Sequence, residues 1–521
     1  MNETALIGIR KAWCTHAVTV AAIVAPFLLN HPARAADPEP LVERGRYLAT
    51  AGDCVACHTA PGGQPFAGGL YMPTPFGDIP TPNITPDKAT GIGSWTDDQF
   101  YRAMHEGIGA DGEYLYPVFP FPWFTKLTRD DVLAIKAYLF SLPPQDAPRQ
   151  PLKLAFPFDI RTGLLAWRTA FFEAGTFEPD PQQSEAFNRG AYLVEGLGHC
   201  GECHNGNNLF GASNWSGRLQ GGQIEGWYAP SLQAHSRDGL GSWSDAQLVT
   251  YLKTGAAPGK GVALGPMQET IDRSLSQLSD ADLQAMATYL KSAANPDAAK
   301  AEEQAAPAEV VAVGAGPYLS HCAFCHGVDG RGMAGMIPAL AGNGAVQAQG
   351  PENVVQVVLG GLEARHDQGP MPAVGVGMSD QDIADVTNYV RTAWGNNAPA
   401  NAEPGAVAEL RAQTRTLLAG NLDGGCPTID DPELAAMVEQ ASVTDQLRGA
   451  APADMLERID AILPELRAPG VGDDAIVNAL TIIYCPAVMA EAGDDQAKRA
   501  ELLGNYSVLA YGQITHGERH P

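Results

Sequence analysis

Three copies of the pattern Cys-x-x-Cys-His constrain this 521-residue chain more than any other feature, and they lie at residues 54–58, 200–204 and 322–326. Two thiols at this spacing can each form a thioether with a haem vinyl group, and the adjoining histidine then reaches the iron as proximal ligand. A closed zinc site would need four ligands, and no second Cys-x-x-Cys stands near any copy. The motifs therefore predict three covalently bound haem c groups. The attachment residues are Cys54, Cys57, Cys200, Cys203, Cys322 and Cys325, and the proximal ligands are His58, His204 and His326.

The N-terminus has the layout of a secretory signal. Arg10 and Lys11 precede an apolar run over residues 17–29, and Ala33-Arg34-Ala35 follows it. The run is shorter than a typical transmembrane helix. We expect cleavage near residue 36 and export to a bacterial periplasm, which agrees with haem attachment outside the reducing cytoplasm. Retention of residues 1–36 as an uncleaved anchor is the alternative.

Two of the nine cysteines remain once Cys14 leaves with the signal and six are assigned to haem motifs; these two are Cys426 and Cys485. An oxidising compartment favours a disulfide between them. Each stands alone directly before a proline, which favours a structural role over redox chemistry.

The net charge of −26 indicates a surface that repels nucleic acid and anionic lipid. Such a surface would instead steer a basic redox partner. The sequence contains no dinucleotide fingerprint, nucleophile elbow or His-Glu-x-x-His motif. We therefore expect no nucleic-acid partner and no substrate chemistry apart from that of haem.

A repeated helical unit accompanies each haem motif. Each unit opens with Gly-x-Tyr-Leu, at residues 45–48, 190–193 and 316–319, and closes with a helix that begins at a capping sequence. An aromatic residue follows each cap by ten positions, on the face that should pack against the opening helix: Tyr138, Tyr289 and Tyr389. The first two units also share a middle helix, which begins after Trp95 and Trp243.

These units resemble class I cytochrome c domains, so the expected fold is all-α, with three such domains in tandem and a C-terminal helical tail. The segment before the second unit is Pro-rich yet apolar and should wrap over the domains, whereas the segment before the third is a flexible linker rich in Ala, Pro and Glu. The tail suits partner docking, an amphipathic peripheral membrane contact or plain helical packing. The predicted boundaries are 37–142, 187–294 and 315–397 for the domains, 143–186 and 295–314 for the connections, and 398–521 for the tail.

The sixth iron ligand differs between the units. Methionine sulfur is the usual ligand opposite histidine in an electron-transfer haem. The closing helices of units two and three are preceded by Gly265-Pro266-Met267 and by Gly369-Pro370-Met371-Pro372. We therefore assign Met267 and Met371 as the sixth ligands of the second and third haems. Competitors in unit three are Met333, Met336 and Met378.

Unit one has Phe119 at the position where methionine is expected, and a phenyl ring cannot coordinate iron. The first haem is then either five-coordinate or ligated by another side chain. The candidates are Met104, His105 and Met72. A lone methionine on a helix is more often a core residue.

The chain resembles the three-haem cytochrome c subunits of membrane-associated periplasmic dehydrogenases, which oxidise alcohols, gluconate or other sugar acids and polyols. The resemblance covers about residues 38–397 and rests on five segments, at residues 83–93, 115–117, 188–200, 340–343 and 394–396. It implies an electron-transfer subunit that is not itself the catalyst. Its electrons would come from a flavin, quinoprotein or molybdenum subunit and pass to ubiquinone or a terminal acceptor.

A narrower resemblance concerns the first haem. The Tyr-Pro-x-Phe-Pro loop and the preceding Arg-Ala-Met resemble cytochrome subunits that serve molybdenum hydroxylase-type dehydrogenases, and this similarity favours Met104 as sixth ligand. The rival hypothesis is a peroxidase-like haem enzyme with an open site at the first haem, and Phe119 is the feature that favours it.

Overall fold

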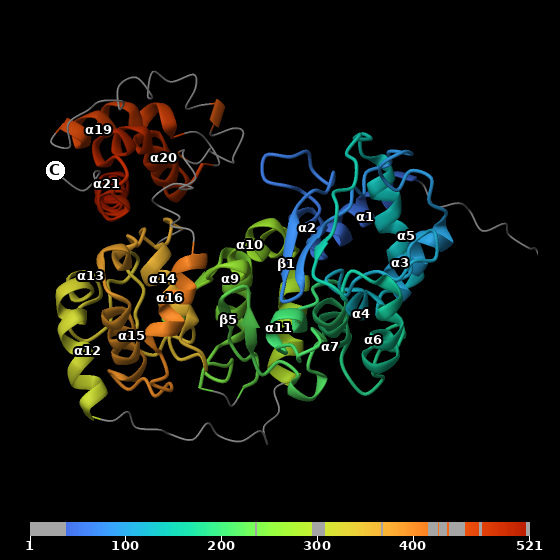
Figure 1. The fold of residues 1–521 in the computed structure, drawn as a ribbon, viewed down its shortest axis with the longest axis horizontal. Helices are drawn as coiled ribbons and strands as arrows, with labels where there is room; N and C mark the ends of the chain where they lie inside the picture. Colours follow the sequence, from blue (N-terminus) through green and yellow to red (C-terminus); the bar gives the residue numbers. More distant parts are fainter. Residues whose placement is uncertain are drawn as a thin grey trace, which may run out of the picture.

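The computed structural model describes residues 38–234, 237–293, 308–365, 368–414, 426, 435–436, 454–467 and 471–516. The predicted signal peptide and most of the predicted linker at 295–314 lie outside these residues. Across the described parts the chain is mostly helical. Figure 1 shows three helical units side by side, with the C-terminal helices above the third.

Each unit has a short helix at its haem motif and a long helix at each end. Unit one contains α1 (Pro38–Ala51), α2 (Cys54–Cys57), α3 (Asp97–Glu106), α4 (Phe121–Phe124) and α5 (Arg129–Ser141). Unit two contains α7 (Glu185–Tyr192), η2 (Leu193–Leu197), α8 (Gly201–His204), η3 (Trp215–Gly217), α9 (Asp245–Thr254), α10 (Pro266–Arg273), η4 (Leu275–Gln277) and α11 (Asp280–Ala293). Unit three contains α12 (Ala308–His321), α13 (Ala323–His326), α14 (Glu352–Gly360), η5 (Val374–Gly377), α15 (Asp380–Thr392) and α16 (Pro404–Gln413).

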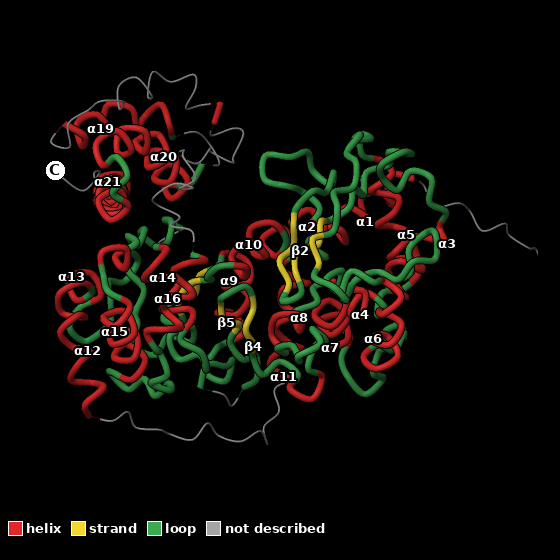
Figure 2. The backbone as a smooth tube through the Cα atoms, viewed as in Figure 1, coloured by secondary structure: helices red, strands yellow, loops and turns green. Residues whose placement is uncertain are grey.

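The fold is mostly helical, as expected, and it also contains short strands that the sequence did not predict. Units one and two and the segment between them contain short antiparallel strands (Figure 2). These are β1 (Tyr71–Thr74), β2 (Gly77–Pro80), β3 (Lys153–Leu154), β4 (Gly222–Ile224), β5 (Trp227–Ala229), β6 (Ala256–Ala257) and β7 (Gly261–Val262). They lie in the Gly- and Pro-rich loops, where no helical periodicity is present and short strand pairs satisfy backbone hydrogen bonds.

The predicted helix starts are confirmed. Thr96 with Gln99 and Ser244 with Gln247 form complete capping boxes at α3 and α9. Each closing helix is also capped, because a Thr or Ser hydroxyl accepts a hydrogen bond from the backbone N–H of an Asp three residues later. Caps depend on neighbouring residues alone, so the sequence is sufficient to predict them.

A glycine allows the opening helix of each unit to touch the closing helix. A Cβ on Gly45 would lie 1.8 Å from the Ala134 carbonyl oxygen, and one on Gly190 would lie 2.0 Å from that of Ala285. Tyr138 and Tyr289 flank these contacts, as their spacing predicts.

The register predicted for unit three is wrong by two residues. The close contact is made by Gly314, whose Cβ would lie 2.2 Å from the Asp385 carbonyl oxygen beside Tyr389. Gly316, the glycine of the sequence pattern, would meet no atom within 4 Å. Tyr318 is therefore not the counterpart of Tyr47 and Tyr192.

Unit two has one more residue than unit one between the helix tyrosine and the haem motif. Tyr192 precedes Cys200 by eight positions, whereas Tyr47 precedes Cys54 by seven. The π-helical turn η2 lies in this interval, and such a turn absorbs an inserted residue without ending the helix.

Units one and two exchange reciprocal tyrosine–aspartate hydrogen bonds. The Tyr47 hydroxyl donates to Asp282 of unit two at 2.6 Å. The Tyr192 hydroxyl donates to Asp131 of unit one, also at 2.6 Å. Each aspartate also pairs with an arginine of its own unit, Arg44 for Asp131 and Arg189 for Asp282. These contacts tie the two units together.

Replacing Tyr192 with phenylalanine should lower the free energy of unfolding of the paired units by about 1–2 kcal/mol, because the buried Asp131 carboxylate loses one of its donors. Urea unfolding of the haem-loaded protein would measure the loss. Tyr71→Phe is the matched control, since that hydroxyl donates to Pro151 O at an exposed site. An equal loss in both variants would contradict the interface role.

The segment between units one and two packs on both of them. Strand β3 pairs with β2, and the Tyr116 hydroxyl donates to Phe158 O at 2.9 Å. The indole N–H of Trp167, in α6 (Leu164–Phe171), donates to Phe210 O of unit two at 3.0 Å. This segment, which also contains η1 (Arg161–Gly163), thus bridges the two units.

The C-terminal tail contains α19 (Met455–Leu466), α20 (Asp473–Ala492) and α21 (Gln496–His516), which share a hydrophobic core. A disulfide joins Cys426 to Cys485 of α20, the pair expected from the cysteine count. Among the described helices, α20 has the length and apolar composition that could cross a membrane, and more than half of its apolar window is buried. Helix α16 lies within the range predicted for the tail, yet its Val407 and Leu410 belong to the core of unit three.

Candidate haem centres

The short helices α2, α8 and α13 present the two cysteines and the histidine of each motif. In all three, the histidine Nδ1 lies within hydrogen-bonding distance of a proline carbonyl: 2.8 Å for His58 and Pro82, 2.7 Å for His204 and Pro230, and 3.2 Å for His326 and Pro338. A carbonyl only accepts, so Nδ1 carries the proton and Nε2 keeps its lone pair. This arrangement fixes the tautomer and ring orientation that an iron ligand needs.

The sequence did not reveal these prolines as functional residues. A signal is nevertheless present, because an Ile or Leu follows each proline by two positions, at Ile84, Leu232 and Leu340. The distance from the histidine varies between 12 and 26 residues, so only the folded structure aligns the three.

Burial sets the protonation of the motif residues. It lowers the pKa of His58, His204 and His326, which favours the neutral imidazole that binds metals. Burial also raises the pKa of both thiols in units one and two to about 12. These cysteines are therefore neutral thiols before attachment.

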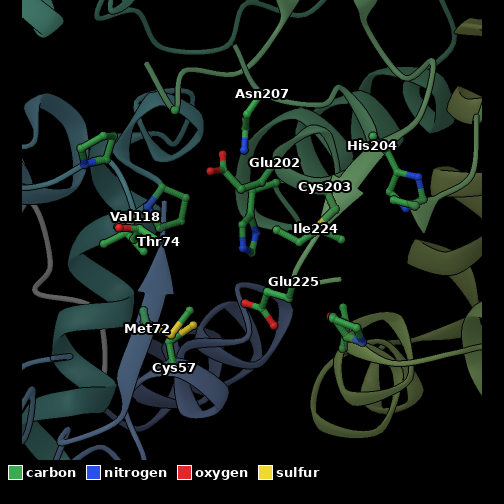
Figure 3. A pocket seen from close by; sticks show the side chains of 18 of the residues that line it. Cys57, Met72, Thr74, Val118, Glu202, Cys203, His204, Asn207, Ile224 and Glu225 are labelled. Carbon is green, nitrogen blue, oxygen red and sulfur yellow. The ribbon is translucent and has the colours of Figure 1, made fainter. Parts of the chain in front are cut away.

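One cavity of about 2250 Å³ joins the motifs of units one and two. It is lined by Cys54, Cys57 and His58 from one unit and by Cys200, Cys203 and His204 from the other. Figure 3 shows Cys57 and Met72 on one side and Cys203 and Ile224 on the other. The volume exceeds the roughly 300–1,000 Å³ of a single small-molecule pocket. Its thiols, imidazoles and mainly apolar walls fit two haem groups.

The candidates for the sixth ligand in units one and two differ in whether they line this cavity. Met267, near the start of α10, lines it. Met104 of α3, which is 6% exposed, also lines it, together with Met72 and Phe119. His105 faces other neighbours: its ring stacks on Tyr101, and its Nε2 lies 3.3 Å from the Thr176 hydroxyl. The arrangement favours a methionine for the first haem.

The third motif lies outside this cavity. Cys322 and His326 are buried, whereas Phe324 between the two cysteines is 99% exposed. Met371 stands in a short hairpin and is half-buried. Of its competitors, Met378 packs in the core of unit three and Met336 packs against the tail, while Met333 is 46% exposed.

Unit one also packs on the haem motif of unit two. The Trp123 indole donates to the Glu202 carboxylate at 2.6 Å, and a Cβ on Gly201 would lie 2.1 Å from Trp123 Cη2. Burial raises the pKa of Glu202 to about 7, against the lowering effect of that hydrogen bond. The first two residues after Cys200 are thus determined by contact with the neighbouring unit, which no local sequence signal indicates.

Comparisons with known proteins agree with this geometry. The family model described as Cytochrome c matches residues 42–143 and 311–394. The chain is 38% identical over 413 residues to the gluconate 2-dehydrogenase cytochrome c subunit of Pantoea cypripedii, covering 74% of this chain and 93% of that one. It is 38% identical over 395 residues to the cytochrome c subunit of alcohol dehydrogenase (quinone) from Gluconobacter oxydans, covering 72% and 82%.

A longer relative also matches. A nicotinate dehydrogenase subunit from Pseudomonas putida is 41% identical over 370 residues, which make up 69% of this chain but only 31% of that protein. The chain thus spans about a third of this relative and most of the other two. Haem motifs, histidine geometry and similarity over most of its length lead to one assignment: the chain belongs to the family of cytochrome c subunits of dehydrogenases.

Proposed function

We propose that this chain carries three haem c groups and conducts electrons from a catalytic dehydrogenase subunit to ubiquinone or a terminal acceptor. The observation that carries the proposal is the single cavity that joins the motifs of units one and two. We expect two groups held in one cavity to lie close enough for electrons to pass between them. Bound haem supplies the chemistry, a one-electron change between Fe(II) and Fe(III).

The residues of the chain hold and tune these groups. The six motif cysteines attach them, and the three histidines, oriented by proline carbonyls, serve as proximal ligands. Met267 and Met371 are the proposed sixth ligands in units two and three, with Met104 in unit one. The apolar walls exclude water, which together with the axial ligand sets the reduction potential.

The middle unit completes the proposed count of three cytochrome c domains. The matching family model covers parts of units one and three. Three features that unit two shares with units one and three support its assignment as a cytochrome c domain. They are the haem motif, the glycine contact between long helices, and the hydrogen bond between histidine and a proline carbonyl.

The names of the relatives support a partner dehydrogenase. The family resemblance adds the expectation that this partner is of flavin, quinoprotein or molybdenum type and acts at the periplasmic side of the membrane. Affinity purification of the native complex would identify the partner. A catalytic subunit of one of these types is the expected result, whereas a cytochrome isolated without any partner would contradict the subunit assignment.

Haem counting tests the cofactor proposal. The mass of the purified protein and its pyridine haemochrome spectrum should both give three haems per chain. Changing Cys200 and Cys203 to alanine together should give two, because that unit loses both thioether bonds. A count of two in the unchanged protein would contradict the proposal.

Peroxide reduction at an open first haem is the second candidate, and the observation that favours it is Phe119 in the cavity wall. Met104 in the same wall opposes it. Carbon monoxide should bind none of the three reduced haems if all are six-coordinate. Ready binding to one haem would favour the peroxidase hypothesis.

A further inference from the structure

The tail contacts unit three at the hairpin that contains Met371. Leu362 and Met371 exchange two backbone hydrogen bonds of 2.8 Å, and Arg365 and Gln368 pair nearer the tip. Pro370 and Pro372 flank Met371 and have no backbone N–H to donate. These two pairs are the hydrogen-bonded pairs that shape the described part of the hairpin, so the position of the Met371 side chain also depends on packing around it.

The Asn478 side chain of helix α20 forms hydrogen bonds with the backbone of the hairpin. The Asn478 oxygen accepts from the Ala364 N–H at 3.1 Å, and its amide nitrogen donates to the Ala364 carbonyl at 3.0 Å. The asparagine thus pairs with Ala364 as a neighbouring strand would. Ala364 is fully buried and belongs to the hydrophobic core of the tail.

Helix α21 packs against residues on both sides of Met371. A Cβ on Gly504 would lie 2.4 Å from Pro372 Cβ, so the helix touches the residue after the methionine. On the other side, a Cβ on Gly369 would lie 3.2 Å from the Tyr511 ring. Ala500 and Ala373 form a small buried cluster one residue further along. Both flanks of Met371 are therefore covered by the tail.

The same hairpin also contacts unit two. Arg365 makes two hydrogen bonds to Asp272, of 2.8 and 2.6 Å. Asp272 lies in α10, the helix that contains Met267. The hairpin is thus held between the tail and the helix of another proposed sixth ligand.

We propose that the C-terminal helical domain is a clamp that holds Met371 in position to ligate the third haem, with Asn478 as the main positioning residue. The proposal rests on Met371 being that ligand. An unclamped hairpin samples more backbone conformations, and ordering it again costs conformational entropy. Loss of the clamp should therefore increase the fraction of time in which the methionine is detached.

Cyanide capture by the ferric, three-haem protein tests the clamp, because cyanide binds when the methionine leaves. Asn478→Leu retains a similar volume but loses both hydrogen bonds, and capture by one haem should become about tenfold faster. Gly504→Ala should have the same effect by pushing α21 away from Pro372. Gln513→Ala, which removes a hydrogen bond to Asp460 within the tail, is the matched control and should leave capture unchanged.

Met371→Ala tests whether Met371 is the iron ligand, separately from whether the tail holds it in place. It should identify the third haem by abolishing its slow capture phase and its sulfur-to-iron charge-transfer band. If that variant changes neither signal, Met371 is not the ligand. If it changes both while Asn478→Leu and Gly504→Ala, with helical content intact by circular dichroism, capture cyanide at the original rate, the clamp is refuted. Hydrogen exchange at Leu362 and Ala364 should rise in both clamp variants, independently of any electron-transfer activity.

Discussion

Gly314→Ala should destabilise unit three by about 3 kcal/mol or more, because the added Cβ overpacks a contact between two helix backbones. The new atom would lie 2.2 Å from the Asp385 carbonyl oxygen and 2.5 Å from Tyr389 Cβ. A backbone oxygen cannot rotate away as a flexible side chain can. Helices α12 and α15 must separate to accommodate the methyl group.

Gly316→Ala is the matched control, two residues away on the same helix. Its Cβ would meet no atom within 4 Å, so the free energy of unfolding should change by no more than about 0.5 kcal/mol. Hydrogen exchange of α12 and α15 in the haem-loaded protein would measure both effects. If Gly316→Ala were the more damaging change, Gly316 and not Gly314 would be the glycine that contacts α15.

Met104→Leu should open the iron of the first haem while preserving the volume of the cavity wall. Leucine offers no sulfur, and Phe119 in the same wall cannot replace it as a ligand. The reduced variant is expected to bind carbon monoxide at one haem of three, whereas the original protein is expected to bind it at none. The reduction potential of that haem should also fall, because methionine ligation raises it.

Met72→Leu is the control for this prediction, since Met72 lines the same cavity. It should leave the spectrum and the carbon monoxide stoichiometry unchanged. The opposite pattern, a silent Met104→Leu and an active Met72→Leu, would move the ligand to Met72. Binding of carbon monoxide by the unchanged protein would instead mean that the first haem has no sixth ligand.

Features that depend on neighbouring residues could be predicted from the sequence. The capping pairs at Thr96 and Ser244 are local, and they form as expected. The tyrosines ten residues after each cap share one helical face, and they lie at the predicted contact with the opening helix.

Most features that depend on contacts across the chain could not be predicted, although the cysteine count did predict the disulfide between Cys426 and Cys485. The sequence around unit three offers two glycines, Gly314 and Gly316, and only the crossing of α12 and α15 selects the first. The role of Pro82 depends on the path of the loop that returns it to His58. The shared cavity depends on how the units pack, because residues of all three line it, and no unit shows this in its own sequence.

The tyrosine–aspartate exchange gives units one and two the interface of a homodimer. Each tyrosine–aspartate contact is made twice, once from each side, as in an isologous pair related by a two-fold axis. Unit three cannot join this arrangement, because Gly316 stands two positions after Gly314, where the other units have Tyr47 and Tyr192. A symmetric pair favours neither direction of electron movement, so a preferred direction must come from what differs between the halves. These differences include the Trp123–Glu202 contact at the second motif and the residues proposed to lie opposite His58 and His204.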